Sequence, residues 1–348
     1  MSEDSAWLVL LSLILTMQQN ASTIDFAEYP HLERSILSSA RIINGSKADR
    51  SKTKHQISLR RRDSDFPFGS GHICGGSLIM PNIVLSAAHC FVDPEIGDGT
   101  FLPKSDFIVT MGTQDRFRRS KRTLVFDLAD IIFPLDKFNL STHKDDLVLI
   151  FLNASVPENH KTVQPINLSE TPVRPSTICQ VTGWGLTEEN ETSIELLVVD
   201  VPLISDKDCR MQSIYGDFLV DGMMCAGYLE EGQRDACNGD SGGPLVCNKQ
   251  LAGIVSWGLK CAVPKTPGVY TNVSYYKDWI LDNIQAYQML RTKYPHGTIV
   301  ILPRPVEAKD DIDNKTSSDD NTNEALFLYN LEHKLQIQLP ITINTTCN

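Results

Sequence analysis

The sequence lacks an excess of basic residues, a long apolar run and a long-period repeat. Its 32 Lys and Arg stand against 43 Asp and Glu, so a net charge of −11 disfavours binding to nucleic acid or anionic membranes. No apolar run reaches the roughly 18 to 20 residues that a membrane-spanning helix needs. These absences exclude a collagen, a coiled coil, a solenoid and a polytopic membrane protein.

Nine cysteines in 348 residues favour an oxidising compartment. The apolar segment Ala6–Met17 has the length of a signal-peptide core, and the small residue Ala21 suits cleavage. Because no Lys or Arg precedes this segment, an uncleaved anchor is the alternative. We expect a signal peptide over residues 1–21 and a secreted, extracellular glycoprotein. Beyond residue 21, eight residues open Asn-x-Ser/Thr sequons: Asn44, Asn139, Asn153, Asn167, Asn190, Asn272, Asn314 and Asn344.

The composition changes again after about Tyr287. Several prolines interrupt any helix there, and the run DDIDNKTSSDDNTNE is acidic and nearly free of apolar residues. The final LQIQLPITI alternates as an edge strand would. We therefore predict that residues 286–348 form a C-terminal extension, largely a disordered acidic linker.

Between Ile42 and about Gln285, short β-prone runs alternate with Gly, Pro, Asn and Asp turns. They include GGSLIM, NIVLSAA, DFIVTMG, LVLIFLN, CQVTGWG, LAGIVSWG and PGVYTNV. This spacing predicts an all-β sandwich or barrel. One helix is expected to begin near Ser274 and to pack onto the barrel through one apolar face: Tyr276, Trp279, Ile280 and Ile284.

Two motifs place a histidine and a carboxylate beside apolar strands. LSAAHC ends with His89 next to Cys90, whose disulfide would hold the histidine on a rigid loop. In DDLVLI, Asp146 borders the apolar run and needs a buried hydrogen-bond partner, whereas strand alternation directs Asp145 toward solvent. Taken alone, His89 also fits a structural histidine, and Asp146 fits a strand-end turn carboxylate.

A third motif, CNGDSGGP, places Ser241 among glycines that let backbone N–H groups approach a substrate carbonyl. A serine hydroxyl is a poor nucleophile without a base, and the base needs a carboxylate to fix its tautomer. A glycine-rich turn is the alternative for this string alone. His89, Asp146 and Ser241 together supply all three parts and favour a catalytic triad.

These strings, with IING, VTGWG and PGVYTNV, resemble the trypsin-like serine proteases of the chymotrypsin fold, from which the general triad template itself is drawn. The resemblance covers Ile42 to about Gln285. It implies an all-β fold of two six-stranded antiparallel β-barrels with a C-terminal helix, and a triad in the cleft between the barrels. It implies no cofactor and no metal.

By the same resemblance, Ser241 is the nucleophile, His89 the general base and then acid, and Asp146 the carboxylate that orients His89. The backbone N–H groups of Gly239 and Ser241 form the oxyanion hole. Asp235 forms the floor of the specificity pocket and selects a substrate Arg or Lys, because a buried carboxylate requires a cation. The residues expected to line this substrate-binding pocket are Ser256, Gly258 and Gly268.

The string SSAR-IING predicts control by proteolysis. The resemblance implies that cleavage after Arg41 frees the α-amino group of Ile42, which then pairs with Asp240. Residues 22–41 would be a propeptide and residues 42–285 the protease domain. Asn44 replaces the glycine usual in the family, and a glycan there would crowd the inserted terminus.

Eight of the nine cysteines allow 105 pairings, and spacing alone does not choose among them. The resemblance selects four disulfides: Cys74 with Cys90, Cys179 with Cys247, Cys209 with Cys225, and Cys237 with Cys261. Cys347 is left over. Its thiol could be free, capped or joined to another chain by an intermolecular disulfide.

Three departures from the family concern substrate choice. The segment Arg60–His72 is longer and more charged than in digestive trypsins and is expected near the cleft rim. Lys260 stands where the family usually has glycine and would narrow the pocket entrance. Gln114–Arg122 is basic where calcium-binding trypsins carry acidic ligands, so we expect no calcium there. Both basic runs fit either a solvated loop or an exosite.

The sequence thus predicts a secreted zymogen that becomes a serine endopeptidase and cuts after Arg or Lys in limited proteolysis. Its expected partners are a protein substrate, an activating trypsin-like protease and a protease inhibitor. The alternative is a catalytically silent homologue that acts as a regulatory binding protein. Such homologues commonly lose a triad residue, and this chain keeps all three.

Overall fold

The structure is a computed structural model that describes residues 45–93, 96, 99–134, 138, 140–187, 191–232 and 234–293, and the backbone of 300–301 and 337–338. By internal contacts the chain divides into residues 1–39 and 40–348, and every described residue belongs to the second unit. The predicted signal peptide and propeptide, Arg41, Ile42, Asn44 and most of the C-terminal extension lie outside the described residues.

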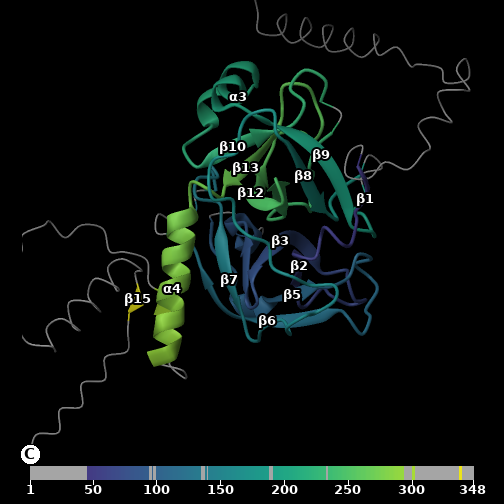
Figure 1. The fold of residues 1–348 in the computed structure, drawn as a ribbon, viewed down its shortest axis with the longest axis vertical. Helices are drawn as coiled ribbons and strands as arrows, with labels where there is room; N and C mark the ends of the chain where they lie inside the picture. The colour runs from purple at the N-terminus through teal and green to yellow at the C-terminus, as the bar shows by residue number, and fades with distance from the viewer. Residues whose placement is uncertain are drawn as a thin grey trace, which may run out of the picture. The chain divides into compact units, whose positions relative to one another are not determined.

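The first barrel consists of six antiparallel strands that close in the order β2-β3-β4-β7-β6-β5 (Figure 1). Closure leaves no strand edge unpaired. The strands are β2 (Gln56–Arg61), β3 (His72–Met80), β4 (Ile83–Ser86), β5 (Phe107–Met111), β6 (Leu124–Ile132) and β7 (Val148–Leu152). Two short 3₁₀ turns accompany them, at Ala88–Phe91 and Lys104–Asp106.

The second barrel closes through the pairing of β8 with β9 in the order β8-β9-β10-β13-β12-β11, and the short β1 (Ser46–Lys47) adds to β9. Its strands are β8 (Ile178–Gly183), β9 (Leu197–Ile204), β10 (Met223–Ala226), β11 (Pro244–Cys247), β12 (Gln250–Trp257) and β13 (Gly268–Asn272). Helix α3 (Asp206–Gln212) and a 3₁₀ turn at Gly216–Phe218 lie between β9 and β10. The prediction of two six-stranded barrels is confirmed.

The burial pattern along each strand reflects which of its residues face the inside of the barrel and which face the outside. In β6 and β9, residues alternate between buried and more exposed, as expected for strands with one face in a core. All five residues of β7 are buried, because the C-terminal helix α4 (Lys277–Lys293) covers the outside of the first barrel. The ring of Tyr287 stacks on Phe151 with centroids 3.6 Å apart.

Helix α4 runs beyond residue 285, where the change in composition suggested a boundary. The predicted apolar face is present, since Tyr276, Ile280 and Ile284 are buried in the first core and Trp279 packs against it. Buried Asp130 of β6 adds a polar anchor, accepting a hydrogen bond from the Tyr287 hydroxyl at 2.9 Å and pairing with Arg291 and Lys104. In the extension, Val300–Ile301 pairs antiparallel with Ile337–Gln338.

All four disulfides implied by the family resemblance are present: Cys74–Cys90, Cys179–Cys247, Cys209–Cys225 and Cys237–Cys261. Cys179–Cys247 closes the longest loop, with a sequence separation of 68, and joins strands that are also hydrogen-bonded neighbours. Cross-links of this kind restrict the unfolded chain and typically stabilise a domain by about 2–4 kcal/mol each.

Candidate active site

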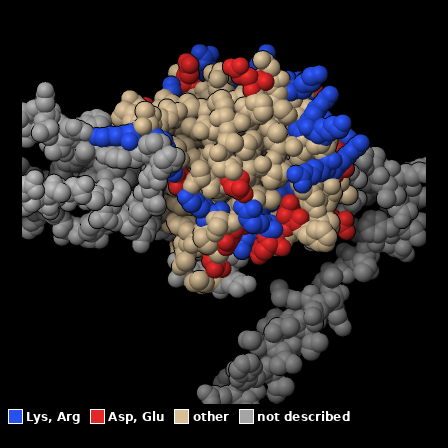
Figure 2. All heavy atoms as spheres, turned by 90° about the horizontal axis from the view of Figure 1, so that it is seen from below, with Lys and Arg blue, Asp and Glu red and all other residues tan. Residues whose placement is uncertain are grey.

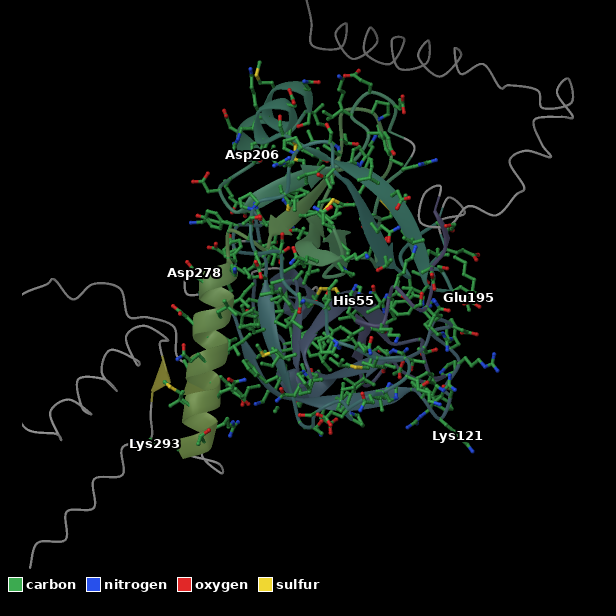
Figure 3. The ribbon with its side chains drawn as sticks, viewed as in Figure 1. His55, Lys121, Glu195, Asp206, Asp278 and Lys293 are labelled. Atoms are coloured by element: carbon green, nitrogen blue, oxygen red, sulfur yellow. A yellow bond between two sulfur atoms is a disulfide. The ribbon has the colours of Figure 1, made fainter. Side chains whose placement is uncertain are left out.

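The three predicted triad residues come from both barrels. His89 lies in the 3₁₀ turn after β4, Asp146 lies two residues before the start of β7, and Ser241 lies in the turn before β11. The Gly75 N–H of β3 donates to the Ser241 carbonyl at 2.7 Å, so the serine loop of the second barrel rests on the first. His55 and Glu195, labelled in Figure 3, mark the level at which the two barrels meet.

His89 and Asp146 form a tightly bonded pair. His89 Nδ1 lies 2.8 Å from Asp146 Oδ2, and the His89 backbone N–H donates to Oδ1 at 2.9 Å. The Ser256 hydroxyl donates to the same carboxylate, which is fully buried. Asp145 turns the other way, but the expectation that it faces solvent is wrong, because it is half-buried and accepts a hydrogen bond from the Tyr276 hydroxyl at 2.7 Å.

The pKa values of this pair move apart. Burial acts to raise the pKa of Asp146, but the charge of His89 and the hydrogen bonds from His89 and Ser256 outweigh burial and lower that pKa. Burial acts to lower the pKa of His89, and the Asp146 charge and hydrogen bond reverse this and raise it. The ionised Asp146 therefore holds the proton of His89 on Nδ1 and leaves Nε2 as the acceptor.

Ser241 lies in a turn whose shape depends on glycine. Gly239 has a φ of +95°, and a Cβ there would lie 3.0 Å from the Gly185 Cα. A Cβ at Gly242 would lie 2.3 Å from the Ser86 Oγ, so this turn packs closely on the end of β4. Between the described Ser241 and His89 side chains there is no hydrogen bond, as is common before substrate binds.

A buried hydrogen-bond network that was not predicted from the sequence lies behind Gly239. The Gly239 carbonyl lies 3.1 Å from His72 Nε2, His72 Nδ1 lies 2.8 Å from the Ser58 Oγ, and Arg60 Nε donates to that Oγ at 2.9 Å. Burial lowers the pKa of His72 to about 3, so the ring is neutral. The only consistent arrangement has Ser58 donating to Nδ1 and Nε2–H donating to Gly239.

This network corrects one expectation about the segment Arg60–His72. We predicted a charged loop at the cleft rim, but Arg60 is fully buried and His72 contacts Gly239. The signal in the sequence was the position of Arg60 inside the strand QISLRR, where a basic residue in a buried strand requires acceptors. Its guanidinium finds them in Ser58, Asp65 and the Arg116 carbonyl.

Asp235 is a buried carboxylate that packs against Gly268. Its side chain is buried, the Ala262 N–H donates to Oδ2 at 3.2 Å, and no described group donates to Oδ1. A Cβ at Gly268 would lie 2.8 Å from that Oδ1. Burial raises the pKa of Asp235 to about 7. A buried carboxylate with one oxygen that accepts no hydrogen bond from the described residues suits a cationic ligand.

The other residues predicted to line the pocket differ in which groups are available to contact a ligand. The Ser256 hydroxyl is committed to Asp146, so only its backbone remains for a ligand, at the register shift between Val255 and Trp257. Gly258 is exposed, and a Cβ there would meet only the Tyr215 hydroxyl at 3.8 Å. Lys260 is exposed as well. The His143 ring, not predicted from sequence, lies 6.2 Å from His89.

Asp240 is a second buried carboxylate near Asp235. It is fully buried and accepts hydrogen bonds from the Gly185 N–H at 2.8 Å and the Cys237 N–H at 2.9 Å. Burial raises its pKa to about 6 against these two bonds. A Cβ at Gly183 or Gly185 would lie within 2.5 Å of its oxygens, so glycine is required at both positions.

Two places could suggest a metal. Cys74, His89 and Cys90 lie together, but both sulfurs are joined in a disulfide and offer no thiolate. In Gln114–Arg122, the buried Arg116 guanidinium donates to the Ser193 and Gly69 carbonyls at 2.9 and 3.2 Å. A fixed positive charge in this loop disfavours a bound cation.

Comparison with known proteins agrees with this geometry. The family model described as Trypsin matches residues 42–280. Trypsin zeta of Drosophila melanogaster is 33% identical over 287 residues, covering 80% of this chain and 97% of the relative. Trypsin II-P29 of Gallus gallus is 37% identical over 250 residues, covering 71% and 90%. With two closed six-stranded barrels and these matches, the chain belongs to the trypsin family of serine proteases.

Proposed function

We propose that this protein is a secreted serine endopeptidase, made as a zymogen, that hydrolyses peptide bonds after Arg or Lys in limited proteolysis. The proposal rests on two observations: the His89–Asp146 pair of the first barrel, on which the Ser241 turn rests through Gly75, and the buried Asp235, one of whose oxygens accepts no hydrogen bond from the described residues. The first arrangement provides the chemistry, and the second selects the bond.

In the proposed reaction, the Ser241 Oγ attacks the scissile carbonyl carbon while His89 Nε2 takes its proton. The carbonyl oxygen becomes an oxyanion, stabilised by the N–H groups of Gly239 and Ser241. His89 then gives the proton to the leaving amine as the C–N bond breaks, which leaves an acyl-enzyme. A water, deprotonated by His89, releases the acid and restores Ser241. Asp146 stabilises the imidazolium throughout.

Specificity for Arg or Lys follows from the electrostatics of Asp235. A substrate guanidinium or ammonium that reaches the free Oδ1 would keep the carboxylate ionised and offset the cost of its burial. An apolar side chain would leave the carboxyl group without that partner. Lys260 is exposed and stands two residues before Ala262, whose N–H donates to Asp235, so its positive charge would disfavour basic residues beside the cleaved position.

Activation would begin with cleavage after Arg41. The new Ile42 ammonium is proposed to pair with Asp240, whose burial and raised pKa indicate that a cation would stabilise it. This pairing would fix the turn that contains Gly239 and Ser241. A glycan on Asn44 would oppose it, so Asn44 is proposed to be unmodified in an active enzyme.

Export is supported by the four disulfides, which fit an extracellular protein. Of the described sequons, Asn153 and Asn167 are exposed, whereas the Asn272 Oδ1 is occupied by the Ser274 N–H and hydroxyl. Within the part of the chain that the structure describes, no helix is long and apolar enough to span a membrane. The proposed partners of this protein are a protein substrate, an activating protease, a protease inhibitor and a protein joined to Cys347 by an intermolecular disulfide.

The test uses secreted protein processed after Arg41. Matched Arg, Lys and Phe p-nitroanilide peptides are the substrates, with Ser241→Ala as the control. We expect hydrolysis of the Arg and Lys peptides, little of the Phe peptide and none with the variant. Absence of both hydrolysis and labelling by a fluorophosphonate would support the alternative, a silent homologue, and Asn44→Gly and Lys260→Gly would then be the first reversions to examine.

A further inference from the structure

Two loops that lie far apart in the sequence form one basic surface on the first barrel. We define the basic surface as residues 117–122, whose cations are Arg118, Arg119, Lys121 and Arg122, together with the adjoining uncharged loop residues 66–70. The Phe68 ring lies between the two loops, with the Arg60 guanidinium 4.4 Å and the Arg119 guanidinium 5.9 Å from its centroid. Arg116 donates to the Gly69 carbonyl at 3.2 Å and locks the loops together.

The four cations in residues 118–122 are exposed, and no carboxylate of the described residues forms an ion pair with any of them. Their neighbours differ: Arg61 pairs with Asp63 and Asp106, and Arg62 with Asp127. Figure 2, viewed from the β5–β6 end, shows Lys and Arg side chains projecting together from one edge. Such a group of like charges in a protein of net charge −11 favours an anionic partner.

The same surface also carries exposed aromatic side chains. Phe66 is 94% exposed and Phe117 is 39% exposed, one from each loop. Solvated charged loops have no need of large apolar side chains, whereas binding surfaces commonly combine aromatic anchors with a charged rim. The pattern therefore fits an acidic peptide that also presents an apolar side chain, rather than a small anion.

The basic surface connects directly to the catalytic centre. Phe68 packs on Arg60, and Arg60 reaches the Gly239 carbonyl through Ser58 and His72. Only these buried side chains separate the surface from the predicted oxyanion donor. These contacts fix the position of the basic surface relative to Gly239, as a surface that binds a substrate segment outside the cleft requires.

We propose that the basic surface binds an acidic, extended segment of the protein substrate, outside the cleft. The proposal rests on the proposed function only in naming the partner a substrate. The acidic run at residues 310–324 of this chain is the competing occupant. Lys293, after which the extension begins, and Lys121 are on opposite sides of the domain in Figure 3, which favours a partner over the chain's own extension.

The experiment measures fluorescence anisotropy of a fluorescein-labelled peptide of Glu, Gly, Leu and Phe on full-length Ser241→Ala protein processed after Arg41. The peptide has no Lys or Arg, so it cannot use Asp235. Its counterpart with Gln for Glu is the charge control. The test variant adds Arg118→Glu, Arg119→Glu and Lys121→Glu. The matched control adds Lys52→Glu, Lys207→Glu and Lys249→Glu, three exposed lysines outside the surface.

We expect the Glu peptide to bind, the Gln peptide to bind far more weakly, and added salt to weaken binding. The test variant should lose roughly tenfold or more in affinity, as several surface ion pairs are lost, and the matched control should lose little. Phe66→Ala should lose a few-fold. Equal losses in the two triple variants, or no binding of the Glu peptide, would overturn the proposal.

Two readouts separate this proposal from its rivals. Binding that appears only after removal of residues 309–348 would assign the surface to the chain's own acidic extension and overturn the proposal. Hydrolysis of the Arg p-nitroanilide, measured with the same substitutions in the Ser241 protein, should be unchanged. A processed protein that binds the Glu peptide without hydrolysing the small substrate would refute the proposed function and leave the binding surface established.

Discussion

Asp146 and Asp235 are both buried carboxylates, but they differ in the hydrogen bonds they accept, and their pKa values shift in opposite directions. Asp146 receives hydrogen bonds from the His89 backbone, the His89 ring and the Ser256 hydroxyl, and its pKa is lowered. Asp235 receives a weak bond from Ala262 on one oxygen, none from the described residues on the other, and its pKa rises to about 7.

The difference shows how burial alone does not define a role. A carboxylate whose acceptors are all satisfied within the fold can only hold its neighbours in place, which is what His89 requires. A carboxylate with an unsatisfied oxygen gains most when a cation arrives from outside. We therefore expect Asp146 to govern the rate of the chemistry and Asp235 to govern which bond is cut.

The largest expected effect is on the rate when Asp146 is changed. Asp146→Asn would replace an acceptor by a donor at Nδ1, favour the wrong tautomer of His89 and leave Nε2 protonated. We expect kcat to fall by about 10⁴-fold, the loss that this change causes in a protease of the same family. Steady-state kinetics with an Arg p-nitroanilide measure it, and a loss of less than about tenfold would contradict the orienting role.

The next effect concerns selectivity. Asp235→Ser should lower kcat/KM for Arg and Lys peptides by roughly 100-fold or more, because a substrate cation would enter the pocket without a partner. Hydrolysis of the Phe peptide should not fall in parallel. The matched control is Asp217→Ser, an exposed carboxylate in another loop. If kcat/KM fell equally for the Arg and Phe peptides, Asp235 would act in the chemical step rather than in selectivity. Its role would then not differ from that of Asp146.

The pH dependence of kcat/KM tests whether the pKa of Asp235 is raised while Asp146 stays ionised. The pKa of His89 is raised above 6.5 and that of Asp235 to about 7, so both groups gain protons as pH falls below these values, and both must be deprotonated for activity on Arg. The kcat/KM for Arg peptides should then fall by up to about 100-fold per pH unit, and by about tenfold per unit in Asp235→Asn. Identical slopes in the two proteins would contradict the raised pKa.

The smallest effect tests the network behind Gly239. Ser58→Ala would remove the donor to His72 Nδ1 and loosen the Gly239 carbonyl, so kcat should fall by about 3- to 10-fold with little change in KM. Ser64→Ala, on an exposed loop, serves as the control. If Ser58→Ala folds with equal thermal stability and keeps full kcat, Arg60, Ser58 and His72 have only a structural role.

The spacing of the strands predicted an all-β sandwich or barrel, and the family resemblance was needed to specify two barrels and to propose the site residues. Alternating and apolar runs predicted the strands, and the family strings brought His89, Asp146 and Ser241 into relation. The disulfides needed the family resemblance, since spacing alone left their pairing open. The end of α4 was missed because its last turn is held by Asp130, a partner distant in sequence.

The burial of Arg60 and the partner of the Ser256 hydroxyl were not predicted from the sequence, whereas the burial of Asp146 and Asp235 was expected. Arg60 lies in a basic run that suggested solvent, yet its side chain is enclosed by acceptors from three separate segments. Ser256 was predicted to line the substrate-binding pocket, but its hydroxyl donates to Asp146, which comes from the other barrel. The contact of Arg60 with the Arg116 carbonyl and that of Ser256 with Asp146 join segments distant in the sequence, and no local pattern encodes them.

The most direct test of the account maps cleavage sites by mass spectrometry in one unfolded protein substrate, using processed wild type, Asp146→Asn and Asp235→Ser. We predict that wild type cuts after Arg and Lys, that Asp146→Asn cuts the same bonds far more slowly, and that Asp235→Ser loses the preference for basic residues. Cleavage by wild type after apolar residues, or altered bond choice in Asp146→Asn, would contradict the division of roles between the two aspartates.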